Sequence, residues 1–123
     1  MAVSMRILIT GSRDYDNYDA VEKAIINASA GCDPHEVTIV HGGAKGADKL
    51  SGDVAKKYGF NVEVYNADWN AYQGHAGAIR NTTMVKAGAD ICLAFPWIKS
   101  IGTWDCVRKS EDAGIPVVIE PIP

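Results

Sequence analysis

The sequence predicts an α/β fold in which a five-stranded parallel sheet is covered by helices on both faces. Short apolar runs alternate with helix-like stretches along all 123 residues, and strict alternation implies parallel strands joined by right-handed crossovers. The first, second, fourth and fifth apolar runs are nearly continuous, as expected for strands covered on both faces. The length is that of one domain, so residues 1–123 are expected to form a single domain.

The first half of the chain supplies three strands and two helices. The first strand is expected at Met5–Thr10, with residues 1–4 ragged before it. A helix over Tyr18–Ala30 follows, which Asp16 or Asn17 can cap. The second strand is expected at Glu36–Val40, the second helix at Ala47–Tyr58 with Gly59 ending it, and the third strand at Asn61–Tyr65.

The second half begins with an expected loop over Asn66–Gly77 and a helix over Ala78–Ala87 that Gly88 ends. The fourth strand is expected at Ile91–Phe95, followed by a loop over Pro96–Ile101. The last helix, Thr103–Ala113, closes at Gly114 before a fifth strand at Pro116–Ile119. These elements predict a three-layer α/β/α Rossmann-like domain with strand order 3-2-1-4-5, which binds ligands at the carboxyl ends of its strands.

Composition excludes several classes of protein. The three cysteines are odd in number and far apart, and no CxxC occurs, which argues against a disulfide scaffold and a cysteine zinc site. No histidine spacing suggests a metal, so neither a metal nor a cofactor is expected. A net charge of −3 gives no electrostatic basis for binding duplex nucleic acid, so such a partner is not expected. No run is long enough for a bilayer or a signal peptide, so a cytoplasmic protein without membrane partners is expected.

The carboxyl ends of the predicted strands collect the residues that can bind a ligand. The segments that follow strands one to four are Thr10–Arg13, His41–Asp48, Asn66–Asn70 and Phe95–Asp105, and they are rich in Gly, Ser, Thr, Lys, Arg and Trp. A purely structural role does not explain why these residues are concentrated at one edge of the sheet. Trp69, Trp97 and Trp104 all fall near it, where one can stack on a base, although packing is the favoured role of each taken singly.

The stretch HGGAKGAD, His41–Asp48, is the most unusual of these segments. Gly42, Gly43 and Gly46 remove side chains just before a helix, so that backbone N–H groups can face a phosphate or ribose, and Lys45 adds a charge. The alternative is a tight turn in which the glycines only permit packing. His41 can contact the ligand or have a structural role.

Three further groups are candidates for anion binding. In Gly11–Arg13, Ser12 can donate a hydroxyl and Arg13 can clamp a phosphate, or the segment only shapes a loop. Ser100, Gly102 and Thr103 form an anion-binding turn ahead of the last helix, or only a cap. Arg80 and Asn81 are expected to open the third helix. A positive charge there is unfavourable to the helix dipole, so a phosphate or a buried carboxylate should compensate it. The alternative is that Arg80 is a surface residue.

Several motifs together resemble one family. TGSRD, VHGGAKGAD, ADW, the pattern GxxRNxxM at Gly77–Met84, and GADICLAFP followed by Gly102–Thr103 are similar to the YspA-like family of the SLOG superfamily, which also includes DprA/Smf and LOG-type phosphoribohydrolases. The resemblance runs from about Arg6 to Val118. It implies a nucleotide site formed by Gly11, Ser12, Arg13, Gly42, Gly43, Lys45, Gly46, Asp48, Arg80, Asn81, Gly102 and Thr103. It also suggests a homodimer.

The resemblance leaves catalysis open. LOG-type enzymes cleave the N-glycosidic bond of nucleoside monophosphates with an arginine, which Arg80 matches, and a glutamate, whose position falls on Cys106. Asp48 or Asp105 can replace that carboxylate only if one of them faces the ribose. Three interpretations follow: a nucleotide-binding sensor or sequestering module for AMP-like or ADP-ribose-like ligands, a nucleotide N-glycosidase, and a DprA-like single-strand binder or scaffold. The sequence names neither the base nor the number of phosphates.

Overall fold

A five-stranded parallel sheet forms the centre of the protein, in a computed structural model that describes residues 4–122. The strand order β3-β2-β1-β4-β5 confirms the predicted order. The expectation for residues 1–3 lies outside the described residues. The strands are β1 (Met5–Gly11), β2 (Val37–His41), β3 (Asn61–Val64), β4 (Ile91–Phe95) and β5 (Val117–Ile119).

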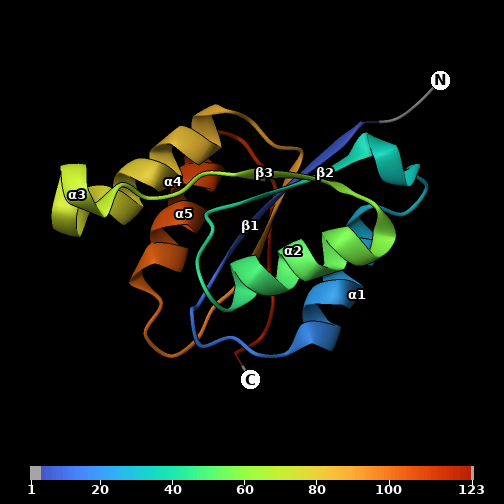
Figure 1. The fold of residues 1–123 in the computed structure, drawn as a ribbon, viewed down its shortest axis with the longest axis horizontal. Helices are drawn as coiled ribbons and strands as arrows, with labels where there is room; N and C mark the ends of the chain where they lie inside the picture. Colours follow the sequence, from blue (N-terminus) through green and yellow to red (C-terminus); the bar gives the residue numbers. More distant parts are fainter. Residues whose placement is uncertain (1–3, 123) are drawn as a thin grey trace.

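Helices cover both faces of the sheet (Figure 1). Helices α1 (Tyr18–Ala28) and α2 (Ala47–Tyr58) pack on one face, and α4 (Ala76–Lys86) and α5 (Ile101–Asp112) pack on the other. The short helix α3 (Trp69–Tyr72) stands out at the end of the molecule toward which β3 runs. Two 3₁₀ turns, Pro34–Glu36 and Gln73–His75, complete the set. No helix within residues 4–122 is long and apolar enough to cross a membrane.

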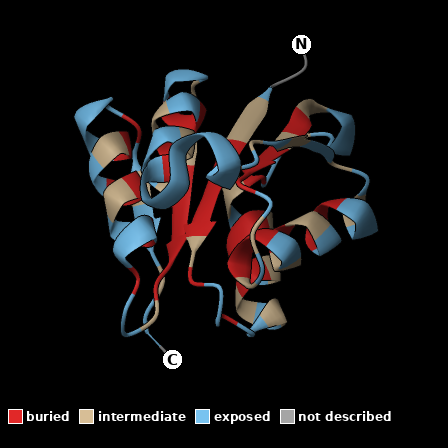
Figure 2. Ribbon diagram, turned by 60° about the vertical axis from the view of Figure 1, so that its left-hand side comes forward, coloured by how far each residue is buried: buried red, intermediate tan, exposed pale blue. Residues whose placement is uncertain are grey.

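The core is split in two by the sheet, because successive side chains of a strand point to opposite faces. On β1, Ile7 and Ile9 pack toward α1 and α2, whereas Leu8 packs toward α4 and α5. Figure 2 shows the central strands buried and the outer helix faces exposed. Cys92 lies in the second half of the core, as predicted, and Cys106 of α5 lies there too.

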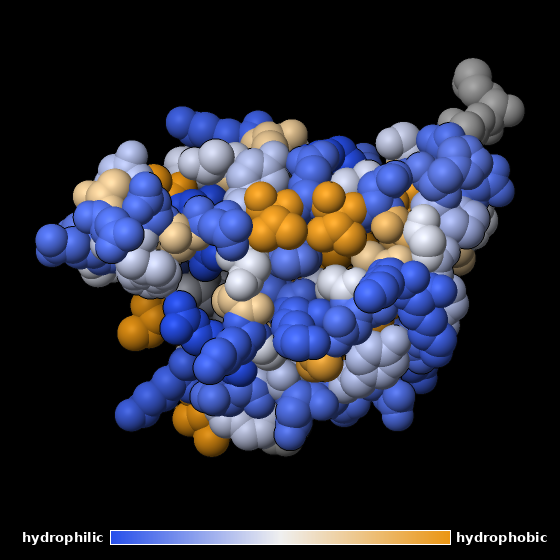
Figure 3. Space-filling model, viewed as in Figure 1, coloured by the Kyte–Doolittle hydropathy of each residue, from blue (hydrophilic) through white to orange (hydrophobic). Residues whose placement is uncertain are grey.

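The edge strands are only partly covered, and one expectation about them is wrong. The fifth run was expected to be covered on both faces, yet Val118 and Ile119 of β5 are 43% and 46% exposed. The helices pack mainly on the three central strands, and the contacts of α5 with β5 and of α2 with β3 leave these edge strands only partly covered. On the other edge, apolar side chains gather over β3 (Figure 3), where Val62 and Val64 are the exposed apolar residues.

The helix ends correct two further expectations. Residues 66–77 are not all loop, because the Asp68 carboxylate accepts a hydrogen bond from the Ala71 N–H (3.0 Å) and starts α3. Helix α4 begins at Ala76, so Arg80 and Asn81 lie in its second turn and do not open it. Asn17 caps α1 as predicted, by accepting from the Ala20 N–H.

Candidate functional site

A cavity of about 340 Å³ opens at the carboxyl end of β1, beside the loop that follows β4. Its walls come from the end of β1 and the loop after it, from α4 and from the first turn of α5. Trp69 of α3 stands at its side. We call it the first cavity. Nine of the predicted ligand-binding residues line it: Gly11, Ser12, Arg13, Asp48, Arg80, Asn81, Ser100, Gly102 and Thr103.

A second cavity, of about 550 Å³, adjoins the first on the side of β2 and β3. The loop after β2 contributes Gly42, Gly43 and Lys45, and the segment after β3 contributes Asn66 and Ala67. The two cavities form one trough along the carboxyl edge of the sheet, because five residues line both of them: Arg13, Asp14, Ala44, Trp69 and Arg80.

The loop from His41 to Asp48 is held by its own polar groups. The buried Asp48 carboxylate accepts hydrogen bonds through Oδ2 from the N–H groups of Gly42 (3.0 Å) and Ala44 (3.2 Å). Nδ1 of His41 accepts from the Gly43 N–H at 2.9 Å. These three amides are therefore already paired. A phosphate at this loop has to find other donors, such as the Lys45 ammonium.

Protein neighbours account for the three glycines of this loop. A Cβ at Gly42 would overlap the Arg80 guanidinium, and one at Gly43 would overlap the Asn66 side chain. At Gly46 a Cβ would overlap the backbone carbonyl of Ser12, and the φ of 72° is in the left-handed region that favours glycine. The packing interpretation therefore has direct structural support. Gly46 and His41 line neither cavity; His41 faces a hollow against α2.

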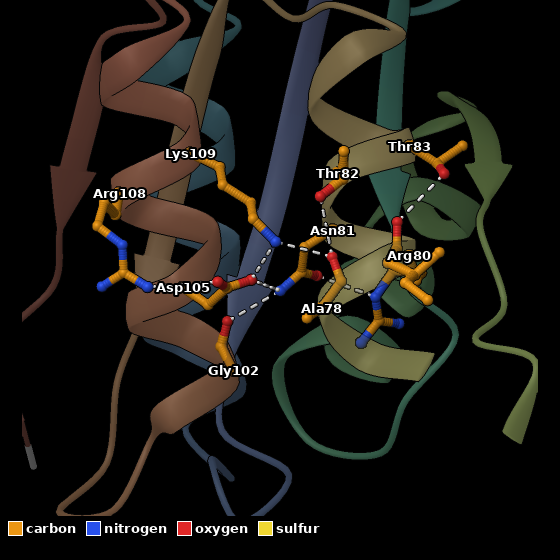
Figure 4. A network of polar contacts seen from close by, with 10 residues as sticks. Ala78, Arg80, Asn81, Thr82, Thr83, Gly102, Asp105, Arg108 and Lys109 are labelled. Atoms are coloured by element: carbon orange, nitrogen blue, oxygen red, sulfur yellow. Dashed lines mark hydrogen bonds and ion pairs between the residues drawn. The ribbon is translucent and has the colours of Figure 1, made fainter. Parts of the chain in front are cut away.

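Arg80 joins the loop to the helices that bound the first cavity. Its Nη1 donates to the Gly42 carbonyl oxygen at 2.7 Å, and its Nε donates to the Asn81 side-chain oxygen at 2.9 Å. The Asn81 amide in turn donates to the Gly102 carbonyl and to Asp105 Oδ2, both at 3.1 Å (Figure 4). This chain of bonds fixes the first turn of α5 relative to α4 and to the loop after β2.

Asp105 lies outside both cavities. Besides Asn81, its carboxylate accepts from Lys109 at 2.9 Å and from Arg108 at 3.3 Å (Figure 4). Burial tends to raise the pKa of Asp105, but the hydrogen bonds from Lys109 and Asn81 outweigh it and hold that pKa below its usual value. Of the two carboxylates considered for catalysis, the structure brings only Asp48 to the first cavity.

Asp48 and His41 are the titratable groups most affected by burial at this edge. Burial raises the pKa of Asp48 to about 6, against the opposing effects of the two loop amides and of Arg80 and Arg13. Burial also lowers the pKa of His41, and the positive charge of Arg80 adds to this effect. His41 is therefore neutral at pH 7, which agrees with its acceptor role at Nδ1.

The start of α5 faces the first cavity through its N-cap residue Ser100 and through Ile101, Gly102 and Thr103 of its first turn. The helix begins at Ile101 and not at the expected Thr103, so Gly102 and Thr103 lie inside the first turn and not ahead of it. The Ser100 hydroxyl accepts from the Trp97 N–H (2.6 Å) and donates to the Trp97 carbonyl (3.0 Å), so it shapes the approach to the helix. In the loop after β1, the Ser12 hydroxyl likewise accepts from the Asp14 N–H at 3.0 Å. Both serines therefore have loop-shaping roles, while their positions place them at the cavity wall.

Sequence reasoning missed Lys99, Asn66 and Asp14, and it left open which tryptophan belongs to the site. Trp69 lines both cavities, Trp97 packs against the core, and Trp104 lines neither cavity. The position of each residue after a strand was visible in the sequence, but the direction of its side chain depends on the loop. Among residues 4–122, no cluster of histidine, cysteine or carboxylate side chains could hold a metal ion.

Comparisons with known proteins identify a family and a relative of this chain. A family model described as "YspA, cpYpsA-related SLOG family" matches residues 5–72. The Gene 61 protein of Mycobacterium phage D29 is 44% identical over 118 residues, which cover 92% of this chain and 94% of that protein.

Two solved structures share the fold. DNA processing protein A (DprA) from Streptococcus pneumoniae superposes with a TM-score of 0.76 at 16% identity, over 98% of this chain. The chain spans only 51% of that protein's length. The protein TM1055 superposes with a TM-score of 0.65 at 14% identity, over 92% of this chain and 72% of the other. At such identities these likenesses concern the fold alone.

Proposed function

We propose that this chain, which belongs to the YspA, cpYpsA-related SLOG family, binds a nucleotide or nucleotide derivative at the carboxyl ends of its strands. In this proposal the protein is a sensor or sequestering module for an AMP-like or ADP-ribose-like ligand. The family and the Rossmann-like fold support a nucleotide-related module. The choice of site comes from the chemistry of the first cavity.

One observation carries the proposal: a helix N-terminus and three cationic side chains converge on the first cavity. The cations are Arg13, Arg80 and Lys99, and the helix is the twelve-residue α5, whose first turn forms part of the wall. Backbone N–H groups and the helix dipole favour an anion at such a place. This concentration of positive charge stands in a chain whose net charge is −3, so it favours an anionic ligand at this edge.

Arg13 is the cation most suited to a ligand. Within residues 4–122 its guanidinium has no hydrogen-bond or ion-pair partner, whereas Arg80 is engaged by the Gly42 carbonyl and by Asn81. A planar guanidinium binds a phosphate bidentately. We therefore assign the phosphate to the space between Arg13 and the first turn of α5.

The test is thermal unfolding with a panel of ligands: AMP, ADP, ATP, GMP, cyclic nucleotides, NAD and ADP-ribose. A ligand at about a hundred times its Kd adds about 2.7 kcal/mol to the unfolding free energy, which raises the Tm by several degrees. Arg13→Ala is expected to reduce the shift, and Lys23→Ala on the exposed surface of α1 is the matched control. Absence of a shift with every ligand would overturn the proposal.

The cavity also favours a second candidate, a nucleotide N-glycosidase. Asp48 lines the first cavity together with Arg80, and its pKa of about 6 is suitable for a general base near neutral pH. In this reaction a water oxygen bonds to C1′ as the C1′–N bond breaks, and Asp48 takes the proton of the water. The base takes up a proton from solvent as it leaves, Asp48 later releases its own proton to solvent, and a ribose phosphate with a hydroxyl at C1′ remains. Asp105, held by Lys109 and Asn81, has no part in it.

Analysis of each thermal-shift mixture for free base separates the two candidates. Free base released by the wild type and not by Asp48→Asn would establish the glycosidase. A Tm shift with the nucleotide recovered intact would support the sensor or sequestering module. The amide of the Asp48→Asn variant keeps an oxygen that can accept from the loop N–H groups, so binding should survive in this variant while turnover is lost.

A further inference from the structure

We infer that the second cavity is the base-binding half of the site, with Trp69 as the stacking surface for the base and the Asn66 amide at its edge. This inference rests on the proposed function, because it takes the phosphate to lie in the first cavity. The two cavities share five lining residues, so one ligand can extend from the first turn of α5 into the space between the loops after β2 and β3.

Trp69 is held at the junction of the two cavities with much of its ring uncovered. It is 49% exposed and lines both cavities. Trp69 is the first residue of α3, which the Asp68 cap fixes. The indole also lies close to α4, since a Cβ placed at Gly77 would be in ordinary van der Waals contact, 3.7 Å, with the ring atom Cη2. An exposed indole fixed in this way is suited to stacking.

The position of Arg13 marks a face of the indole that accepts a flat group. The Arg13 guanidinium carbon lies 5.7 Å from the centre of the Trp69 ring, and the guanidinium has no other partner among residues 4–122. A guanidinium is planar and stacks on aromatic faces. A nucleobase is flat as well, so it takes this face of the ring, and the released guanidinium turns to the phosphate in the first cavity.

Asn66 supplies polar groups for the edge of the base. It lines the second cavity, and its side-chain amide takes part in no hydrogen bond within residues 4–122. A side-chain amide offers a donor and an acceptor side by side, which is the arrangement that pairs with the edge of a nucleobase. The neighbouring lining residues Gly43, Ala44 and Ala67 are small, which leaves room for a ring.

The test compares AMP with ribose 5-phosphate, which has the same sugar phosphate and no base, by titration calorimetry. The wild type should bind AMP more tightly than ribose 5-phosphate. Trp69→Ala should weaken AMP binding by about 5- to 140-fold, the range found when stacking on a base is lost. It should leave ribose 5-phosphate within about twofold. Trp69→Phe should keep most of the AMP affinity, and Asn66→Ala should lower it by about 2- to 12-fold.

Tyr72→Ala is the matched control. Tyr72 lies on the same short helix, has the same 49% exposure, and lines neither of the two cavities. The inference is overturned if Trp69→Ala and Tyr72→Ala weaken AMP equally, if Trp69→Ala weakens both ligands alike, or if the wild type binds the two ligands equally. In that last case the phosphate site remains. If the wild type binds no nucleotide at all, the proposed function fails with it.

Discussion

At the scale of single residues, the loop after β2 shows how steric contact with neighbouring atoms restricts a position to glycine. Gly46 is the clearest case, because two effects act on it at once. Its φ of 72° disfavours any side chain, and the space that a Cβ would take belongs to the backbone of Ser12 and Arg13. Backbone atoms cannot move aside as the end of a flexible side chain can. The turn therefore requires glycine whatever the ligand.

We expect Gly46→Ala to destabilise the protein more than Gly59→Ala. Gly59 has a similar φ of 77°, but a Cβ there would have no neighbour within 4 Å, so alanine costs only the left-handed conformation, about 1–2 kcal/mol. At Gly46 the overlap with Ser12 adds about 1–3 kcal/mol. Urea unfolding of the two variants measures the difference, and equal losses would show that the loop moves freely away from β1.

Asp48 gives the stability of the protein a pH dependence opposite to that of an ordinary paired carboxylate. Its pKa is about 6 in the folded protein and about 4 in the unfolded chain. Between these values the folded state binds more protons than the unfolded state. The contribution of this group to stability therefore falls as pH rises from about 4 through about 6.

The variant Asp48→Asn removes this titration while it keeps an acceptor for the loop amides. Relative to the wild type, its unfolding free energy should rise by about 2 kcal/mol between about pH 4.5 and about pH 7, since most of the pKa difference acts in that window. Urea unfolding at the two pH values measures it. A difference between the two proteins that is constant with pH would mean that Asp48 has an ordinary pKa.

At the scale of elements, the central strands were predictable and the helix starts were less so. β1, β2 and β4 are buried, and a strand that is covered on both faces is a nearly continuous apolar run, which is easy to recognise in a sequence. The four residues of α3 are too few for a helical period and depend on one cap, Asp68. β5 is as apolar as the central strands, so sequence alone does not reveal that Val118 and Ile119 stay exposed at the edge of the sheet.

Asn81 is the residue by which α4 and α5 hold the first cavity in shape. It is buried, and its amide donates to both Gly102 and Asp105 while its oxygen accepts from Arg80. Asn81→Ala would leave the Arg80 Nε without this acceptor and free the first turn of α5. We expect a loss of about 1–3 kcal/mol in unfolding free energy, together with weaker AMP binding.

The neighbouring Thr82→Ala provides the comparison for this variant. Thr82 is half-buried, and within residues 4–122 its hydroxyl donates only to the Ala78 carbonyl of its own helix (Figure 4). Its loss should change the unfolding free energy by no more than about 0.5 kcal/mol. If chemical denaturation shows Asn81→Ala to be as mild as Thr82→Ala, then α5 is held to α4 by apolar packing, and the polar network is not what positions its first turn.

At the scale of the whole molecule, the candidate site was predictable to the extent that topology determines it. Parallel strands bring their carboxyl ends to one edge, so the segments around Gly11, Gly42 and Gly102 had to meet there. The parts that were missed, such as Asn66 and Lys99, depend on where a loop directs each side chain. Asp105 shows the opposite case, since its place on α5 turns it toward Lys109 and away from both cavities.

Charge is distributed unevenly over the molecule. Four of the 12 basic residues line the two cavities, with two of the 15 acidic residues. The basic residues are Arg13, Lys45, Arg80 and Lys99, and the acidic ones are Asp14 and Asp48. The trough therefore carries a formal charge of about +2, and the remainder about −5. A small anion contacts only the positively charged trough, whereas a longer anion also contacts the negatively charged surface outside it.

This distribution predicts that the protein discriminates against nucleic-acid strands. A single-strand binder tracks the backbone with a basic groove over several nucleotides, but here the positive charge ends with the trough. A fluorescent AMP analogue bound at about 150 mM NaCl should therefore be displaced by AMP and not by a thymidine strand of about 20 nucleotides at equal nucleotide concentration. A poly-adenylate strand has the same length and charge as the thymidine strand, so a difference between the two strands measures base preference. Displacement by either strand at lower concentration than AMP would mean that chain length adds contacts, and would favour the single-strand interpretation over a mononucleotide site.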